Sequence, residues 1–478
     1  MTIASFQFLG FVLLVAVIYN ALKSIASRQV FFLCTNLYFL STFSQGVRSY
    51  FPFVAFLALG FVGVRLMKNN RGRRAFVPLL VTVVLAFVWL KKYTFLPTSS
   101  FIGFPYLTIG LSYVFFRLLH LIIDAHDANL PEISLLGYLN YTLNFTTLIS
   151  GPIQWYQEFA EQQLSPDQPL LDVIVAGEAL ERIVIGFFKV TVLSSVLFVV
   201  RARALSALPS LDSFWLRVAT GSTIAVVYPI YLYFNFSGYT DIVIGAARFL
   251  RLQLPENFNR PFSSLNFIDF WGRWHMTLST WLKTYVYTAV VKALMKRFPS
   301  PGVEPFLGVF AFFVTFFLIG VWHGQTSVFV AYGVLLGFGV AVDKLYQVLI
   351  VKAWGRKEYK RLASNATYRA CARGLTFTWF TFSLFWFWSD WSQMASISRA
   401  MGRPALLAMW ISIFLGATVI LSLWEAAREW TLSFQWNGSP LLTSRYVRTV
   451  WDTALATIST AVVLLNNTPA PDIVYKRF

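Results

Sequence analysis

Long apolar segments recur along the whole of this chain of 478 residues and constrain its fold more than any other feature. A helix needs about 20 mostly apolar residues to cross the hydrocarbon core of a bilayer. Segments close to that length occur at 3–22, 29–46, 50–67, 75–93, 105–123, 133–150, 173–200, 214–234, 305–322, 326–350, 374–389, 405–424 and 447–465. They predict an all-α, polytopic integral membrane protein with about 11–13 transmembrane or re-entrant helices.

The composition indicates that one membrane domain occupies the chain. Charged residues make up only 13% of the sequence and hydrophobic residues 57%, whereas ordinary soluble domains carry about 25% charged residues. Because no long polar insert separates the apolar segments, we predict a single domain over residues 1–478. No Lys or Arg precedes Lys23, so residues 3–22 lack the basic region of a signal peptide and are expected to remain as the first span.

The Lys and Arg residues of the sequence lie where the membrane topology predicts them. The formal net charge is +18, but Lys and Arg gather in short connections between apolar segments, as the positive-inside rule describes. We therefore expect membrane lipids, and no nucleic acid, as partners of this charge. The two strongest clusters, which we place on the cytoplasmic side, are Arg65, Lys68, Arg71, Arg73 and Arg74, and Lys352, Arg356, Lys357, Lys360, Arg361, Arg369 and Arg373.

Residues 267–285 have the pattern of an amphipathic helix. Apolar side chains recur at i, i+3, i+4 and i+7 spacing, with polar side chains on another face. Such a helix lies at the membrane interface or lines a water-filled cavity, and either place brings His275 near a substrate. Arg273 has the charge to stabilise an oxyanion or a phosphate there. Arg and His side chains that merely reach headgroups explain the pattern equally well.

His323 closes a long uncharged run and is followed by Gly324, Gln325 and Thr326, so a helix is predicted to end there. At such a break an imidazole is shielded on one side and open to a cavity on the other. It can then take a proton from a hydroxyl near neutral pH. For Trp322, His323 and Gly324 alone, a ring that only bonds a neighbouring carbonyl remains the simpler interpretation.

The other two histidines favour structural roles. His126 lies in a polar loop, which predicts a solvated loop histidine. His120 lies in an apolar stretch with Arg117 and Asp124, spaced like successive turns of one helix face, which predicts a structural polar ladder.

Several familiar catalytic patterns are missing from the sequence. It has no Gly-rich phosphate loop, no G-x-S-x-G elbow and no H-E-x-x-H spacing. The two cysteines, Cys34 and Cys371, are far apart and imply neither a disulfide framework nor a thiolate metal site. We therefore expect no bound metal and no bound cofactor. Asp241 and Glu256 are expected to pair with Arg248, Arg260 or Arg273, because a lone charge is costly in this setting.

Two stretches carry a family resemblance. Residues 234–287 read FNFSGYTDIVIGAARFLRLQLPENFNRPFSSLNFIDFWGRWHMTLSTWLKTYVY, and residues 320–340 read GVWHGQTSVFVAYGVLLGFGV. Together with 110–159 they resemble the membrane-bound O-acyltransferase (MBOAT) family. The similarity is to its bacterial branch of alginate O-acetyltransferase membrane subunits and D-alanyl-lipoteichoic-acid transferases. The resemblance implies that His323 is the essential catalytic histidine, that His275 supports it, and that the helices form a ring around a central funnel or tunnel.

Two details bear on which acyl group is moved. The ending DIVYKRF resembles the alginate type, which favours acetyl transfer, whereas the run TAVVKALMKRF lacks the Gly-Gly-Asn-Arg sequence of that type. We therefore predict transfer of an acyl group, most simply acetyl from cytoplasmic acetyl-CoA, in a bacterial inner membrane. The acceptor is a hydroxyl of an extracytoplasmic polysaccharide or of a periplasmic acyltransferase partner. Transfer of a D-alanyl group to a cell-envelope polymer is the alternative.

In this reaction His323 acts as the base, and several neighbours are candidates for substrate contact. Arg273, Asn257 and Trp274 are candidates to stabilise the oxyanion, and Asp241 and Trp322 are cavity candidates. A transporter of a lipid-linked sugar would also explain broken helices and buried charges, and an inert scaffold is a third possibility. Neither would consume an acyl thioester, and either would tolerate His323→Ala.

Overall fold

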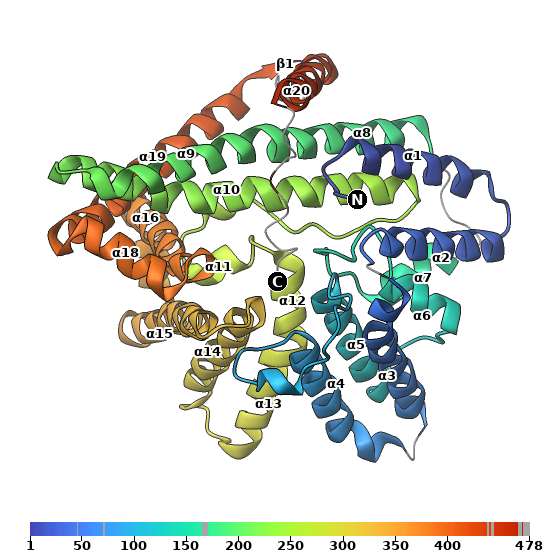
Figure 1. Ribbon diagram of the computed structural model, residues 1–478. Coiled ribbons are helices and arrows are strands. Elements are labelled where there is room, and N and C mark those ends of the chain that lie inside the picture. The colour runs from blue at the N-terminus through green and yellow to red at the C-terminus, as the bar shows by residue number, and fades with distance from the viewer. Residues whose placement is uncertain are drawn as a thin grey trace. The chain divides into compact units, whose positions relative to one another are not determined.

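The computed structural model describes residues 1–44, 46–69, 72–164, 171–436, 439–440, 444–466 and 471 (Figure 1). The chain divides into two compact units. The first contains Met1–Val190 and Phe236–Glu256, and the second contains Thr191–Asn235 and Asn257–Asn466. Arg71 of the first basic cluster and the ending 472–478 lie outside the described residues.

The first unit is built of helices. They are α1 (Phe6–Ala21), α2 (Ile25–Ser41), α3 (Phe51–Lys68), α4 (Phe76–Leu90), α5 (Leu111–His126), α6 (Leu135–Thr142), α7 (Tyr156–Leu164), α8 (Val173–Phe188) and the C-terminal part of α10 (Phe214–Phe249). Figure 1 shows α10 as one long continuous helix, which contributes residues to both units.

The second unit is helical too. Its helices are α9 (Ser195–Ala207), the N-terminal part of α10, α11 (Phe267–Trp271), α12 (Met276–Leu282), α13 (Thr288–Arg297), α14 (Glu304–His323), α15 (Ser327–Ser364), α16 (Ala366–Ser383), α17 (Phe385–Trp388), α18 (Trp391–Met401), α19 (Arg403–Ser433) and α20 (Arg445–Asn466). A two-residue antiparallel pair, β1 (Gln435–Trp436) with β2 (Ser439–Pro440), is its only described sheet.

The prediction of an all-α polytopic membrane protein is confirmed. Seven helical segments among the described residues are long and apolar enough to cross a membrane, and α1 is a shorter apolar helix. The seven are Val47–Lys68, Gly72–Leu90, Val173–Ser210, Glu304–His323, Ser327–Ser364, Arg403–Ser433 and Tyr446–Leu465. Each predicted apolar segment overlaps a helix, but several of these helices are short, so the total of about 11–13 spans and the ring around a tunnel stay predictions.

One predicted segment, 133–150, is mostly not helical. It forms only α6 and then runs through irregular backbone to the cis peptide bond between Gly151 and Pro152. Buried backbone carbonyls outside a helix need donors. Arg117 of α5 supplies them, because its guanidinium donates to the carbonyl oxygens of Tyr141 (3.0 Å), Thr142 (2.7 Å) and Thr147 (2.9 Å).

The rest of the predicted polar ladder is structural as well. His120 accepts a hydrogen bond from the Tyr156 N–H at 3.0 Å, and Asp124 accepts one from the Gln157 side chain at 2.7 Å. The ladder on α5 thus holds the irregular segment and the start of α7. These contacts agree with the predicted polar ladder of Arg117, His120 and Asp124.

Glycines let α14 and α15 lie side by side (Figure 1). A Cβ added to Gly320 would come within 2.1 Å of the Gly333 Cα, and one added to Gly333 would come within 2.5 Å of the Phe317 carbonyl oxygen. Small residues at such points allow helices to approach closely in a membrane. The α14–α15 hairpin carries His323 at its turn, so this packing positions the candidate catalytic residue.

Candidate active site

His323 is the last residue of α14, as the sequence predicts. The chain leaves the helix at Gly324, whose backbone is extended, and α15 begins at Ser327 after Thr326 as its N-cap. The side chain of His323 is buried, with 1% of its surface exposed. A histidine is therefore held inside the protein at a break between two long helices.

Aromatic rings surround this imidazole. The ring centroids of Trp322, Phe387 and Tyr332 lie 4.7, 5.2 and 5.9 Å from that of His323. Trp322 lies on α14, Tyr332 on α15 and Phe387 on the short helix α17, so three helices supply the rings around His323. We call these four side chains the His323 cluster. Such a shell limits the access of water, which strengthens any electrostatic interaction formed inside it. Trp322, a predicted cavity residue, is thus in direct contact with the predicted base.

The prediction of one continuous amphipathic helix over 267–285 is wrong. The chain forms α11, a turn, α12 and a π-helical turn, Lys283–Tyr287, and His275 sits at the break with left-handed backbone angles (φ 46°, ψ 51°). Backbone pairing with an upstream segment competes with the helix. The Met276 N–H donates to the Asn257 carbonyl at 3.0 Å, and the Asn259 N–H donates to the Arg273 carbonyl at 2.9 Å.

This pairing places Asn257 beside His275. The Asn257 Oδ1 accepts from the Thr277 hydroxyl (2.7 Å) and from the Thr277 N–H (3.2 Å), and His275 Nδ1 lies 3.4 Å from it. These contacts fix the amide orientation. The Asn257 Nδ2 is buried and has no hydrogen-bond partner in the described part of the chain. A buried donor without an acceptor costs free energy, about 1–3 kcal/mol, so this atom is a candidate ligand contact.

His275 is buried, with 1% of its surface exposed. Burial lowers the pKa of its imidazole to about 3. The ring lies outside the seven candidate spans and is neutral at physiological pH. It is therefore suited to donate or accept a hydrogen bond rather than to supply a positive charge.

The other residues of this segment are tied to protein partners. Arg273 Nε donates to Asp269 Oδ1 at 2.8 Å, so its charge is already compensated. Trp274 is buried and packs against Phe380, with centroids 5.0 Å apart. The oxyanion roles of Arg273 and Trp274 stay predictions, and of the three candidates only Asn257 presents a buried donor atom without a partner among the described residues.

The segments of both histidines belong to the second unit. Trp271 of α11 contacts Phe316 of α14, with ring centroids 5.3 Å apart, so the helix before His275 packs on the helix that ends at His323. A shared cavity for the two imidazoles stays a prediction.

Asp241 lies in the first unit, and its predicted ion pairs have the wrong partners. Its carboxylate pairs with Arg182 (3.1 Å) and Lys189 (2.6 Å), and Glu256 also pairs with Arg182. The arginines that the sequence suggested pair elsewhere, Arg248 with Glu178, Arg260 with Glu425 and Arg273 with Asp269. The structural character was predicted correctly, but Arg182 and Lys189 could not be chosen from sequence distance. The cavity role of Asp241 stays a prediction.

Sequence reasoning missed Arg201, a residue of α9. Its guanidinium carbon lies 3.8 Å from the ring centroid of Trp388 and 4.8 Å from that of Tyr228. Its Nε and Nη2 atoms are buried and have no hydrogen-bond partner among the residues described. Trp388 is the residue after Phe387 of the His323 cluster. The Arg201 guanidinium therefore contacts a direct sequence neighbour of that cluster. The only signal in the sequence was an arginine directly after the apolar run 173–200.

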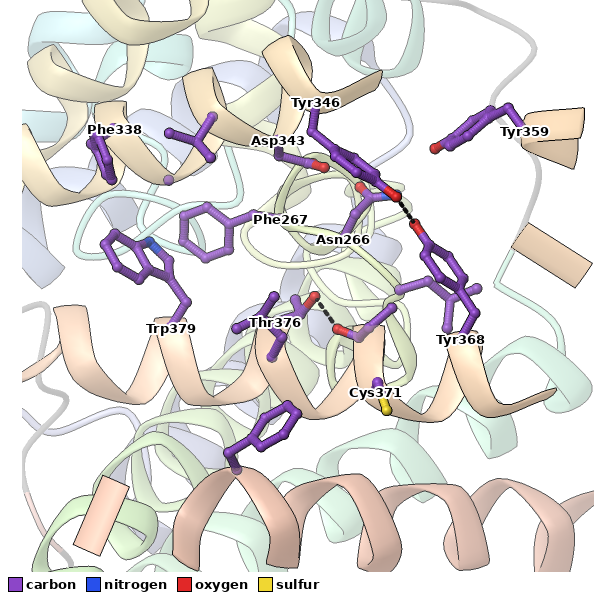
Figure 2. A pocket seen from close by; sticks show the side chains of 16 residues that line it. Asn266, Phe267, Phe338, Asp343, Tyr346, Tyr359, Tyr368, Cys371, Thr376 and Trp379 are labelled. Atoms are coloured by element: carbon purple, nitrogen blue, oxygen red, sulfur yellow. Dashed lines mark hydrogen bonds between the residues drawn. The ribbon is translucent and has the colours of Figure 1, made fainter. Parts of the chain in front are cut away.

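A pocket of the second unit lies away from both histidines. It has a volume of about 580 Å³ and is lined by residues 265–267 at the start of α11, by residues of α15 and α16, and by Phe414 of α19 (Figure 2). Neither His275 nor His323 is among its lining residues. Among the described residues, no group of three or more His, Cys, Asp or Glu side chains is arranged to hold a metal ion.

Comparison with known proteins identifies relatives. The family model described as "MBOAT, membrane-bound O-acyltransferase family" matches residues 2–387. A teichoic acid D-alanyltransferase of Bacillus subtilis (strain 168) is 30% identical over 302 residues, which cover 61% of this chain and 70% of that protein. A probable alginate O-acetylase of Pseudomonas fluorescens is 29% identical over 243 residues, or 50% of this chain and 45% of that protein. The corresponding protein of Azotobacter vinelandii is 27% identical over 357 residues, or 71% and 66%.

Proposed function

This chain belongs to the membrane-bound O-acyltransferase family, and from that premise we propose that it transfers an acetyl group from cytoplasmic acetyl-CoA to a hydroxyl group outside the cytoplasm. The acceptor is a polysaccharide or a periplasmic partner protein, and the membrane is a bacterial inner membrane. The observation that carries the proposal is His323, a buried imidazole at the junction of two apolar helices within the matched region.

His323 performs the proton transfer in this proposal. Its imidazole accepts the proton of the acceptor hydroxyl while the hydroxyl oxygen attacks the thioester carbonyl carbon. The tetrahedral intermediate then collapses, the carbon–sulfur bond breaks, and the thiolate takes the proton from the imidazolium. The products are an ester and free CoA, and His323 returns to its starting state. Trp322 and Phe387 keep bulk water from competing with the acceptor.

Asn257 is our candidate to stabilise the oxyanion. Its Nδ2 is a buried donor without a partner among the described residues, and its orientation is fixed by Thr277. A preorganised donor of this kind costs no reorganisation when charge develops on the carbonyl oxygen. His275, neutral and adjacent to Asn257, supports the geometry.

Asn257→Asp is expected to lower kcat by about 10²-fold or more, because the donor becomes an acceptor that repels the oxyanion. The variant keeps the oxygen that accepts from Thr277, but a buried carboxylate without a charged partner costs free energy, so thermal stability is measured beside kcat and only folded protein is compared. Asn259→Asp is the matched control, since it adds the same charge two residues away on an exposed side chain. Wild-type kcat in Asn257→Asp would remove this residue from the oxyanion site.

Arg201 is our candidate to bind negative charge on the acceptor. Alginate and teichoic acid, the polymers named in the relatives, are both acidic. A guanidinium with two buried nitrogens lacking a hydrogen-bond partner in the described chain, held over Trp388 and Tyr228, is suited to a carboxylate or a phosphate.

Arg201→Gln is expected to raise KM for an acidic acceptor by about 10- to 100-fold, as hydrogen bonds to charged groups contribute about 1.5–3 kcal/mol. The KM for the acyl donor should remain unchanged. Arg203→Gln, an exposed arginine on the same helix, serves as the control. If Arg201→Gln lowers thermal stability and leaves both KM values unchanged, its role is only to pack against Trp388.

Transfer of a D-alanyl group is a second candidate function. The Bacillus subtilis D-alanyltransferase is 30% identical over 302 residues, whereas the probable alginate O-acetylases of Pseudomonas fluorescens and Azotobacter vinelandii are 29% and 27% identical over 243 and 357 residues, so both kinds of relative match this chain to a similar degree. The departure from the Gly-Gly-Asn-Arg run agrees with it, whereas the ending DIVYKRF favours acetyl transfer.

The deciding experiment uses inner membranes from cells that express the chain, compared with membranes that lack it. Labelled acetyl-CoA and a labelled D-alanyl thioester are supplied separately, and incorporation of label into extracytoplasmic polymer or protein is measured. Chain-dependent incorporation of acetyl supports the proposal, and incorporation of D-alanine alone replaces it with the second candidate. If the chain changes the fate of neither label, acyl transfer is contradicted in favour of a transporter or a scaffold.

A further inference from the structure

The pocket between α15 and α16 has the build of a lipid site. Its volume of about 580 Å³ lies within the range of small-molecule sites, about 300–1,000 Å³. Figure 2 shows an apolar end, with Phe338, Phe267 and Trp379, and a polar end, where hydroxyl groups gather. The pocket is therefore amphipathic along its length.

The apolar rim of the pocket is exposed on the surface of the second unit. Leu375, Phe338 and Val342 are exposed by 61%, 52% and 45%, respectively. The last two belong to the candidate span Ser327–Ser364. Exposed apolar side chains on a membrane-spanning helix face acyl chains, so the mouth is open to the bilayer rather than to water alone.

Three tyrosines form the polar end. The hydroxyl groups of Tyr346 and Tyr368 point toward one another and lie 3.4 Å apart (Figure 2). Tyr359 joins them because α15 is kinked at Gly355, whose φ of 81° favours glycine. Phenol groups donate hydrogen bonds to the ester and phosphate oxygens of a lipid headgroup while their rings stay in apolar surroundings.

The chain around the polar end is strongly basic. Residues 343–373 contain eight Lys and Arg residues and two acidic residues. Asp343 lines the pocket, and its carboxylate accepts hydrogen bonds from the Ile268 N–H and the Gln347 amide. Glu358 pairs with Arg361 at 3.0 Å. Basic residues next to a membrane surface attract anionic lipids by about 1 kcal/mol each. This charge distinguishes an anionic headgroup from a zwitterionic one.

We propose that this pocket binds an anionic phospholipid, with an acyl chain between α15 and α16 and the headgroup among the tyrosines and the basic residues of 344–373. The pocket is not lined by either candidate catalytic histidine, so the lipid is a bound component of the second unit and not the acyl acceptor. The inference does not depend on the acyl-transfer proposal.

The test is native mass spectrometry of the full chain, delipidated in detergent and titrated with phosphatidylglycerol or phosphatidylcholine. Wild type is expected to bind phosphatidylglycerol at least about tenfold more tightly, which is about 1.4 kcal/mol. Ala372→Trp, which fills the pocket, should abolish this binding, whereas Ala366→Trp, an exposed position on the same helix outside the lining, should not.

A second variant tests recognition of the lipid headgroup separately from binding of the acyl chain. Combined replacement of Arg356, Lys360 and Arg369 by Gln should bring phosphatidylglycerol binding down to the level of phosphatidylcholine while leaving the pocket itself intact. Equal binding of both lipids by wild type, or wild-type binding by Ala372→Trp, would overturn the proposal. So would an unchanged lipid preference in the Gln variant.

Discussion

His323→Ala is expected to reduce acyl transfer by about 10²- to 10⁴-fold, the usual contribution of a general base, while leaving the protein folded. Alanine removes the imidazole that accepts the hydroxyl proton, and no other histidine lies among the rings described around this position. His323 is the last residue of α14, and Gly324 follows it as the C-cap. Because the substitution leaves Gly324 in place, the helix can still end at residue 323. The measurement is the rate of label transfer from acyl donor, with folding checked by size-exclusion chromatography.

The matched control is His126→Ala. The sequence placed His126 in a polar loop, but it is the last residue of α5 and is half-buried. It contacts Asp127 at 2.7 Å and stacks on Phe76, with ring centroids 4.0 Å apart. Both variants remove one imidazole, but only His323 has the proposed chemical role. Comparable transfer rates in wild type and folded His323→Ala would rule out His323 as the base. A loss of rate in His126→Ala as well would point to a general effect on folding.

The membrane architecture and the end of α14 could be predicted from the sequence because both are local. An uncharged run followed by Gly324 and a new N-cap at Thr326 defines a helix end without knowledge of the rest of the chain. The polar ladder of Arg117 and Asp124 was also readable, since its members share one helix face and buried charges need partners.

The features that the sequence did not predict depend on residues far apart in the chain. The break at His275 follows from backbone pairing with Asn257, which is stronger than the local helical pattern. Asp241 pairs with Arg182, and the Arg201 guanidinium lies over Trp388. The spacing of these residues along the sequence does not indicate either pair. Hydrophobic periodicity describes the faces of one helix, so it does not predict which residues of different helices are in contact.

Gly320→Leu is expected to destabilise the second unit by about 3 kcal/mol or more and to remove most acyl transfer. A Cβ at this position would lie 2.1 Å from the Gly333 Cα and 2.3 Å from its nitrogen. Both are backbone atoms, so no side chain can rotate away, and α14 and α15 must separate. Overpacking of this kind costs about 1–3 kcal/mol even where side chains can adjust, and here the helix ending at His323 must move.

Gly416→Leu on α19 is the matched control, because a Cβ there meets nothing within 4 Å. We expect its midpoint of thermal unfolding in detergent to stay within a few degrees of wild type, as a glycine replaced by leucine also gains helix propensity, about 0.8 kcal/mol. Gly320→Leu should instead unfold at a clearly lower temperature and lose activity. If Gly320→Leu has the same midpoint of thermal unfolding as wild type, α14 and α15 do not pack as closely at Gly320 as the structure shows. The position of His323 would then need another support, because that approach is what fixes the turn between the two helices.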